Sequence, residues 1–124
     1  MVLAKKTPME WNSWNTFGAN IDHELICQTA DVMAKEGYLE AGYDTLVIDD
    51  GWQAYGCSAD RHLLVDEKRF PYGMKAVADY VHSKGLPLVR TWNFTPARTK
   101  CLYAVKRWAR TAQSGLPTIS TRIS

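Results

Sequence analysis

The chain has 124 residues, of which 46% are hydrophobic and 23% charged, an ordinary globular composition that excludes disordered and fibrous proteins. Its net charge of +2 conceals an asymmetry, because residues 1–89 hold all 13 acidic side chains, whereas residues 90–124 hold basic side chains and no acidic one. No apolar run approaches the ~18 residues of a membrane span, and no secretory signal is visible.

The first predicted element lies within residues 7–18, where a polar residue follows each tryptophan and a glycine ends the run. This alternation favours a short strand with one face in the core and the other face open. We expect Trp11 to pack in the core. Trp14 is either a second core side chain or a flat apolar platform for a sugar ring or a base.

A helix is predicted next, capped by Asp22, carried by residues 23–36 and ended by Gly37. Acidic residues in its first turn suit the helix dipole. Its apolar stripe is expected to face the core and not a ligand. The stripe consists of Ile26, Ala30, Met33 and Ala34.

Residues 45–48 are apolar or β-branched and predict a buried strand, which runs directly into two adjacent carboxylates, Asp49 and Asp50. A core strand has no use for such a pair. The two carboxylates are therefore either solvated in a turn, which the following Gly51 also favours, or placed in a pocket that binds a polar ligand.

Residues 53–72 are polar and irregular, and a connection of that length is typically functional. A second helix is predicted over residues 74–84, with Val77, Tyr80 and Val81 facing the core, and a third strand begins at residues 86–89. Such alternation predicts an α/β fold with a parallel sheet. Ligands of parallel sheets gather beyond the carboxyl ends of the strands, which favours the pocket for the acidic pair.

The remaining residues differ in kind. Residues 99–115 fit a basic amphipathic helix, and residues 116–124 predict an unstructured end. Basic helices can bind membranes or nucleic acid, but a solvated charged face is the favoured interpretation, so we expect neither partner.

Three cysteines and three histidines are scattered without metal-ligand spacing, so we expect no metal and no cofactor. An odd number of cysteines cannot pair completely within one chain, which favours a reducing, cytoplasmic compartment. Nothing in the sequence indicates the oligomeric state. The residues concerned are Cys27, Cys57, Cys101, His23, His62 and His82.

Several motifs, collinear over residues 7–88, together resemble the N-terminal quarter of the α-galactosidases of glycoside hydrolase family 27. They are Met9-Glu10-Trp11-Asn12-Ser13-Trp14-Asn15-Thr16-Phe17-Gly18, Gln28-Thr29-Ala30-Asp31, Ala41-Gly42-Tyr43, Ile48-Asp49-Asp50-Gly51-Trp52-Gln53, Lys68-Arg69-Phe70-Pro71-Tyr72-Gly73-Met74-Lys75 and Asp79-Tyr80-Val81-His82-Ser83-Lys84-Gly85-Leu86.

The resemblance implies that residues 1–89 form part of a (β/α)₈ TIM barrel, about its first three strands and two helices. It also implies an α-galactosidase that hydrolyses terminal α-D-galactosyl residues with retention. Trp14 is then a wall of the galactose pocket, and Asp49 and Asp50 accept hydrogen bonds from the sugar. A carboxylate that accepts two hydroxyl bonds rejects the wrong epimer, which leaves a buried charge unpaired.

The chain departs from the family pattern in two places. Secreted members often carry paired cysteines where this chain has Ala19 and Gly51, and the loss of both agrees with a reducing compartment. At the third strand the family usually continues into Gly-Ile-Tyr, whereas this chain reads Val89-Arg90-Thr91. We therefore hypothesise that residues 90–124 are a basic extension without family match, from a frameshifted or misassembled gene.

The catalytic carboxylates of the family come later in the barrel, and no Asp or Glu follows Asp79 here. We therefore assign no catalytic residue and expect the chain to be incomplete and inactive alone. Two alternatives stay open. One is a non-catalytic fragment or basic binding module, and the other is an α-N-acetylgalactosaminidase or β-L-arabinopyranosidase of the same family.

Overall fold

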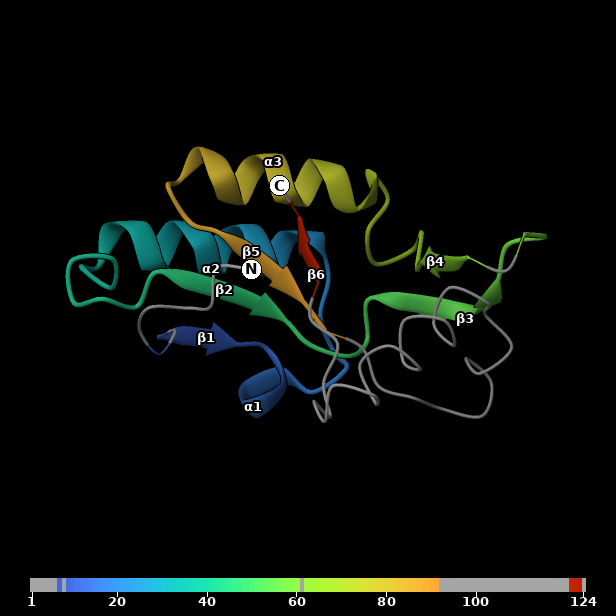
Figure 1. Cartoon of the computed structure of the whole chain (residues 1–124), viewed down its shortest axis with the longest axis horizontal. Helices are drawn as coiled ribbons and strands as arrows, with labels where there is room; N and C mark the ends of the chain where they lie inside the picture. The colour runs from blue at the N-terminus through green and yellow to red at the C-terminus, as the bar shows by residue number, and fades with distance from the viewer. Residues whose placement is uncertain (1–6, 8, 61, 92–120, 124) are drawn as a thin grey trace.

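The computed structural model describes residues 7, 9–60, 62–91 and 121–123. Three parallel strands, β1 (Glu10–Asn12), β2 (Thr45–Ile48) and β5 (Leu88–Arg90), lie side by side in that order. Helices α2 (His23–Lys35) and α3 (Gly73–Ser83) cover one face of this sheet, as Figure 1 shows. The predicted α/β alternation of three strands and two helices is confirmed.

Helix α2 begins and ends where its caps predict. The Asp22 carboxylate accepts a hydrogen bond of 2.8 Å from the Leu25 amide, and Gly37 takes a positive φ of 80° after the last turn. Ile26, Ala30 and Met33 are buried against the sheet. The predicted place of Ala34 in this stripe is wrong, because one residue beyond Met33 the helix has turned about 100° and this side chain is exposed.

Helix α3 packs beside α2, with Val77 and Val81 fully buried. Its Tyr80 is only half-buried and does not belong to the core as predicted. The Tyr80 hydroxyl instead donates to the Asp31 carboxylate on α2. The same carboxylate forms an ion pair with the Lys84 ammonium group at 2.8 Å. The two helices are thus joined by a polar contact on the outside and by apolar packing on the inside.

The core lies between the two helices and the sheet. Because β2 is covered on the helix side, Leu46 and Ile48 are fully buried there, and Leu88 of β5 lies beside them. Burial of such side chains is the main stabilising term of a fold of this size. Phe70 and Trp52 extend the core toward the carboxyl ends of the strands.

The segment after β2 is more regular than predicted. Strands β3 (Gln53–Cys57) and β4 (Leu63–Val65) form an antiparallel hairpin within the expected irregular connection over residues 53–72. The sequence pattern of a strand is weak here, because the apolar residue Tyr55 lies on the exposed side and Gly56 interrupts the alternation of apolar and polar side chains. In the structure Tyr55 is almost fully exposed and Gly56 has a φ of 100°.

The first element is shorter than predicted, because β1 ends at Asn12 and a four-residue helix, α1 (Trp14–Phe17), follows. Its Trp11 packs against the core, as expected.

A further strand, β6 (Thr121–Ile123), pairs antiparallel with β5, where the sequence predicts an unstructured end. It supplies partners for backbone groups on the open edge of β5, a long-range effect that no local pattern reveals. The predicted helix over residues 99–115 lies outside the described residues.

Candidate functional site

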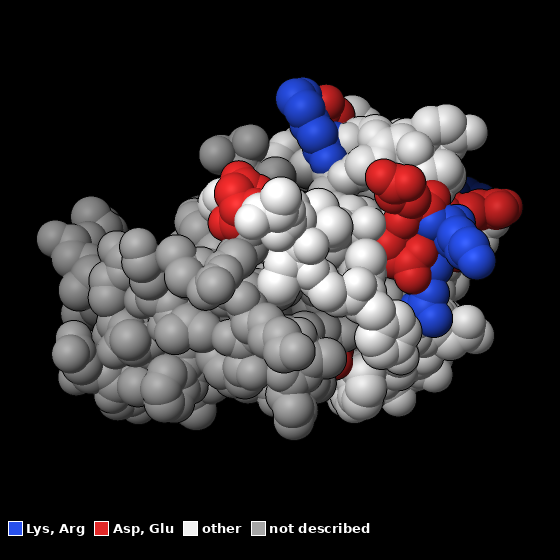
Figure 2. Space-filling view, turned by 90° about the vertical axis from the view of Figure 1, so that its right-hand side faces the viewer, with Lys and Arg blue, Asp and Glu red and all other residues white. Residues whose placement is uncertain are grey.

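The carboxyl ends of β1, β2 and β5 meet at one edge of the sheet. The register places Asn12 opposite Val47 and Ile48 opposite Arg90, so the residues that follow each strand come together. Polar side chains occupy this edge, which is where parallel sheets bind ligands. Figure 2 looks onto this end of the molecule, and acidic and basic side chains lie close together on its described part.

The Asp49 carboxylate accepts three hydrogen bonds from described residues at this edge. Its Oδ1 accepts hydrogen bonds from the Thr91 hydroxyl at 2.6 Å and from the Asp50 amide at 2.8 Å. Its Oδ2 accepts one from the Asn12 side-chain amide at 3.0 Å. The Asp49 amide in turn donates to the buried Ser13 hydroxyl at 2.9 Å. Three separate segments therefore fix one carboxylate.

These contacts set the charge state of Asp49. Partial burial would raise the pKa of its carboxyl, but the three hydrogen bonds it accepts, that from Thr91 foremost, outweigh burial and leave the pKa below its ordinary value of 3.8. The carboxylate is consequently ionised throughout the neutral range and can act only as an acceptor.

Asn12 joins the first strand to this carboxylate and also starts α1. Its side-chain oxygen accepts a hydrogen bond of 2.8 Å from the Trp14 amide, while its side-chain nitrogen donates to Asp49. Trp14 lies two residues after the last residue of β1, and 45% of its surface is exposed. The half-exposed indole offers an apolar face at this end of the sheet, and Asn12 links the Trp14 backbone to the Asp49 carboxylate.

The turn after Asp50 depends on close backbone packing. Gly51 has a φ of 105°, and a Cβ atom placed there would lie 2.7 Å from the Cα of Ala19. The Arg69 guanidinium bridges the two segments, since it donates to the carbonyl oxygens of both Ala19 and Gly51. The two positions that carry paired cysteines in secreted family members are thus in contact here, joined through a noncovalent bridge.

Thr91 and Arg90 close the site on the side of the third strand. The Trp52 indole donates a hydrogen bond of 2.7 Å to the Thr91 carbonyl oxygen, and the Thr91 amide donates to the Ile48 carbonyl at 2.8 Å. The Arg90 guanidinium lies 4.3 Å from the centre of a Trp52 ring. Sequence reasoning missed these contacts because it placed the end of the family resemblance at residue 89 and assigned no site residue beyond it.

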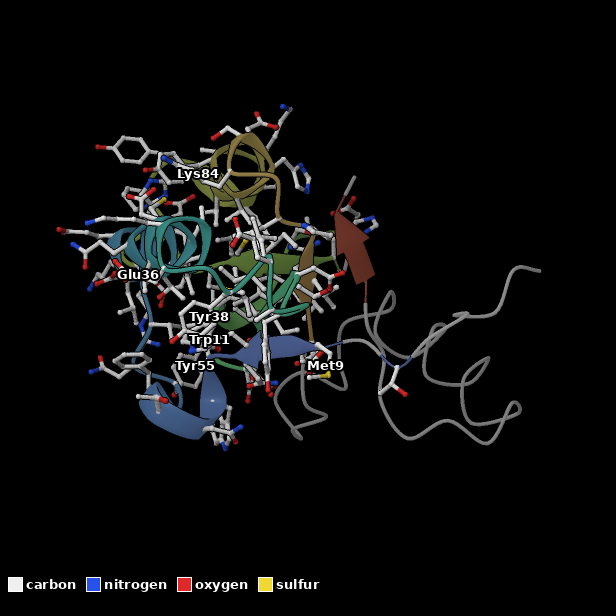
Figure 3. All side chains as sticks on the ribbon, turned by 90° about the vertical axis from the view of Figure 1, so that its left-hand side faces the viewer. Met9, Trp11, Glu36, Tyr38, Tyr55 and Lys84 are labelled. Atoms are coloured by element: carbon white, nitrogen blue, oxygen red, sulfur yellow. The ribbon has the colours of Figure 1, made fainter. Side chains whose placement is uncertain are left out.

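The opposite end of the sheet carries none of the predicted site residues. Figure 3 looks onto that end, where Glu36 and Tyr38 follow α2 and Lys84 follows α3. A separate groove of about 600 Å³ lies on the helical side, between α2 and the segment before α3. It is lined by Asp22, His23, Glu24, Cys27, Gln28, Asp31, Lys68, Arg69, Pro71, Tyr72 and Tyr80.

Cys57 is disulfide-bonded, whereas Cys27 carries a free thiol. The odd number of cysteines favours a fully reduced chain, and the disulfide at Cys57 corrects that expectation. The sequence does not reveal which cysteines approach each other. In the part of the chain that the structure describes, no group of three or more His, Cys, Asp or Glu residues could hold a metal ion. The described helices include none with the length and apolar character of a membrane span.

The family described as alpha galactosidase A matches residues 6–101. The chain belongs to this family. Among its relatives, "Alpha-galactosidase A" of Cellvibrio japonicus is 50% identical over 88 residues, which cover 69% of this chain and 21% of the relative. "Alpha-N-acetylgalactosaminidase" of Gallus gallus is 40% identical over 96 residues, which cover 69% and 24%. The family match also includes residues 90–101, beyond the predicted boundary at residue 89.

Solved structures of α-galactosidases show the same arrangement of strands and helices. The α-galactosidase of Saccharomyces cerevisiae, solved with raffinose, is 36% identical and aligns with a TM-score of 0.62 over 65% of this chain and 18% of that one. The described residues are thus similar to an N-terminal portion of the α-galactosidase barrel, as predicted. The chain spans about a fifth of the length of the α-galactosidases it matches.

Proposed function

We propose that this chain carries part of the galactose-binding wall of an α-galactosidase, with Asp49, Asp50 and Trp14 in contact with the sugar. The observation that carries the proposal is the ionised Asp49 carboxylate, which hydrogen bonds from three segments hold at the carboxyl edge of the sheet. A fixed acceptor and a half-exposed indole that follow strands at the same end of the sheet suit a sugar, which presents hydroxyl donors along its rim and C–H groups on one face.

The chemistry of this edge favours discrimination between epimers. Galactose and glucose differ only at C4, where the hydroxyl is axial in one and equatorial in the other. A carboxylate held rigidly at one position accepts a bond from the hydroxyl that reaches it and stays unpaired with the epimer that does not. The raffinose in the yeast relative is an α-galactoside, and it supports a galactoside as the ligand class here.

The complete reaction of the family, hydrolysis with retention, requires a nucleophilic and an acid/base carboxylate about 5–5.5 Å apart. Asp49 and Asp50 serve binding in our proposal, and we assign neither of them the role of nucleophile. The part played by this chain is therefore recognition of the sugar.

Titration of the ¹⁵N-labelled chain with galactose and with glucose tests the proposal. We expect galactose to shift amide signals at millimolar concentration, glucose to bind at least about tenfold more weakly, and Asp49→Asn and Asp50→Asn each to weaken galactose binding by a similar factor. Asp79→Asn is the matched control, because among the described residues Asp79 pairs with the exposed Lys75 of its own helix α3 and with no residue of the site. Equal binding of both sugars, or a loss in the control as large as in the site variants, would count against the proposal.

A second candidate sugar is α-linked N-acetylgalactosamine, because the Gallus gallus relative bears that specificity in its name. It shares the axial C4 hydroxyl with galactose and differs at C2. The same titration with N-acetylgalactosamine separates the two, since tighter binding of the acetylated sugar would favour this candidate and tighter binding of galactose the first.

A further inference from the structure

Thr91, the residue immediately after β5, is fixed at three points. Its amide donates to the Ile48 carbonyl at 2.8 Å, its carbonyl accepts from the Trp52 indole at 2.7 Å, and its hydroxyl donates to Asp49 at 2.6 Å. The backbone bonds hold Thr91 whatever its side chain is. The hydroxyl is therefore presented to the carboxylate by a rigid support.

The hydrogen bond from Thr91 to Asp49 is the shortest of the three that this carboxylate accepts, as expected when a hydroxyl donates to a charged oxygen. Together with the bond from Asn12 to the other oxygen, it fixes the carboxylate plane from both sides. A carboxylate that lost the Thr91 bond could rotate about its terminal torsion, which is soft for an aspartate.

The donors also limit what the carboxylate can still accept. An ionised carboxylate offers about four acceptor positions, two on each oxygen. Oδ1 is engaged twice, by the Thr91 hydroxyl and the Asp50 amide, and Oδ2 is engaged once, by Asn12. Among the contacts with described residues, this leaves one position, on Oδ2, for a ligand. This count differs from the two sugar hydroxyl bonds that the sequence-based interpretation assigned to a site carboxylate.

We propose that Thr91 is a positioning residue for sugar recognition, which holds the Asp49 carboxylate so that its Oδ2 accepts a single sugar hydroxyl. The inference rests on the proposed function for its ligand, but the geometry at Asp49 stands on the protein alone. Thr91 makes no contact with the sugar in this proposal and acts through Asp49.

Thr91→Val tests the proposal, because valine keeps the shape of threonine and removes the hydroxyl. Thr91→Ser keeps the hydroxyl. Thr29→Val is the matched control, since in the described part of the chain the Thr29 hydroxyl donates to the Leu25 carbonyl of its own helix. Two quantities are measured in each variant: the pKa of the Asp49 carboxyl by ¹³C NMR, and the dissociation constants of galactose and glucose.

We expect Thr91→Val to raise the Asp49 pKa, because the carboxylate loses a hydrogen bond that stabilises its charged form. The variant should also bind galactose about tenfold more weakly and prefer galactose over glucose less strongly, because the carboxylate loses its fixed orientation. Serine should restore all three quantities, and Thr29→Val should change none. If valine disturbs folding, Thr91→Ala removes the same hydroxyl with a smaller side chain and is measured in its place.

Two outcomes would overturn the inference. One is an unchanged Asp49 pKa with unchanged galactose affinity in the variant without the hydroxyl, and the other is an equal change in Thr29→Val. A wild-type chain that binds no galactose contradicts the proposed function instead, and the pKa of Asp49 in Thr91→Val then decides alone whether Thr91 fixes this carboxylate.

Discussion

At the scale of single residues, the site depends on side chains that follow strands and bond to one another. Asn12 is the last residue of β1, Asp49 and Thr91 directly follow β2 and β5, and the first and last of these three side chains donate to Asp49. None of the three is unusual by itself. Their combination creates an oriented negative charge at the sheet edge, which is a suitable acceptor for a ligand rich in hydroxyl groups.

Gly51 is the position where this edge tolerates change least. An added Cβ would meet the Ala19 backbone at 2.7 Å, and the φ of 105° is strained for any other residue. We expect Gly51→Ala to lower the free energy of unfolding by about 2–4 kcal/mol, measured by urea denaturation.

Gly56→Ala is the control for this prediction. Gly56 has a similar φ of 100° but nothing within 4 Å of its would-be Cβ, so only the backbone strain of about 1–2 kcal/mol applies. Equal losses in the two variants would show that the approach of Gly51 to Ala19 carries no cost.

The bonds to Asp49 predict how stability responds to acid. Because its pKa is lowered in the folded state, Asp49 contributes stability that is present above its unfolded pKa near 3.8 and is lost as the pH falls through the lower folded value. The difference in unfolding free energy between wild type and Asp49→Asn should therefore be largest at neutral pH and shrink below about pH 4.

Chemical denaturation of both proteins at several pH values measures this difference. Other carboxyls with lowered pKa, such as Asp31, titrate in the same range, but they are common to both proteins and cancel. A difference that stays constant from pH 7 to pH 2 would contradict the assigned hydrogen bonds.

At the scale of elements, the sequence predicts what local periodicity encodes. Both helices and the β2 strand were found because apolar residues recur at helical spacing or in one short run, and because Asp22 and Gly37 mark helix ends. Hairpin β3–β4 was missed where Tyr55 and Gly56 break the pattern. The partners of Asp49 and the pairing of β6 with β5 were also missed, since contacts between segments distant in sequence leave no local signal.

The buried stripe of α2 gives a prediction at this scale. Ile26 is fully buried between helix and sheet, whereas Val32 on the same helix is 51% exposed. We expect Ile26→Ala to cost about 2–5 kcal/mol of unfolding free energy and Val32→Ala less than about 0.5 kcal/mol. Thermal and urea unfolding of the pair measure both, and similar losses would show that the helix is oriented differently.

At the scale of the whole molecule, the chain spans about a fifth of the α-galactosidases it matches, and its strands and helices are similar to the N-terminal part of their barrel. In that part, the described residues bring together the ends of three parallel strands. We propose that this chain supplies a share of the sugar pocket, and we assign none of its residues to the hydrolysis step.

This division predicts binding without turnover. We expect the purified 124-residue chain to release no chromophore from a chromogenic α-galactoside above the rate of buffer. An α-galactosidase assayed in parallel is the positive control. Turnover that Asp49→Asn abolishes would mean that a nucleophile is present in this chain and that our assignment of Asp49 to binding alone is wrong.

The most direct test of the central claim is the map of galactose on the chain, obtained from residue-assigned NMR shifts during titration. The account predicts that the amides of Asp49, Asp50 and Thr91 and the Trp14 indole shift together, and that Gln28 in the separate groove stays unchanged. Shifts concentrated around that groove, or no shifts at the sheet edge, would contradict it.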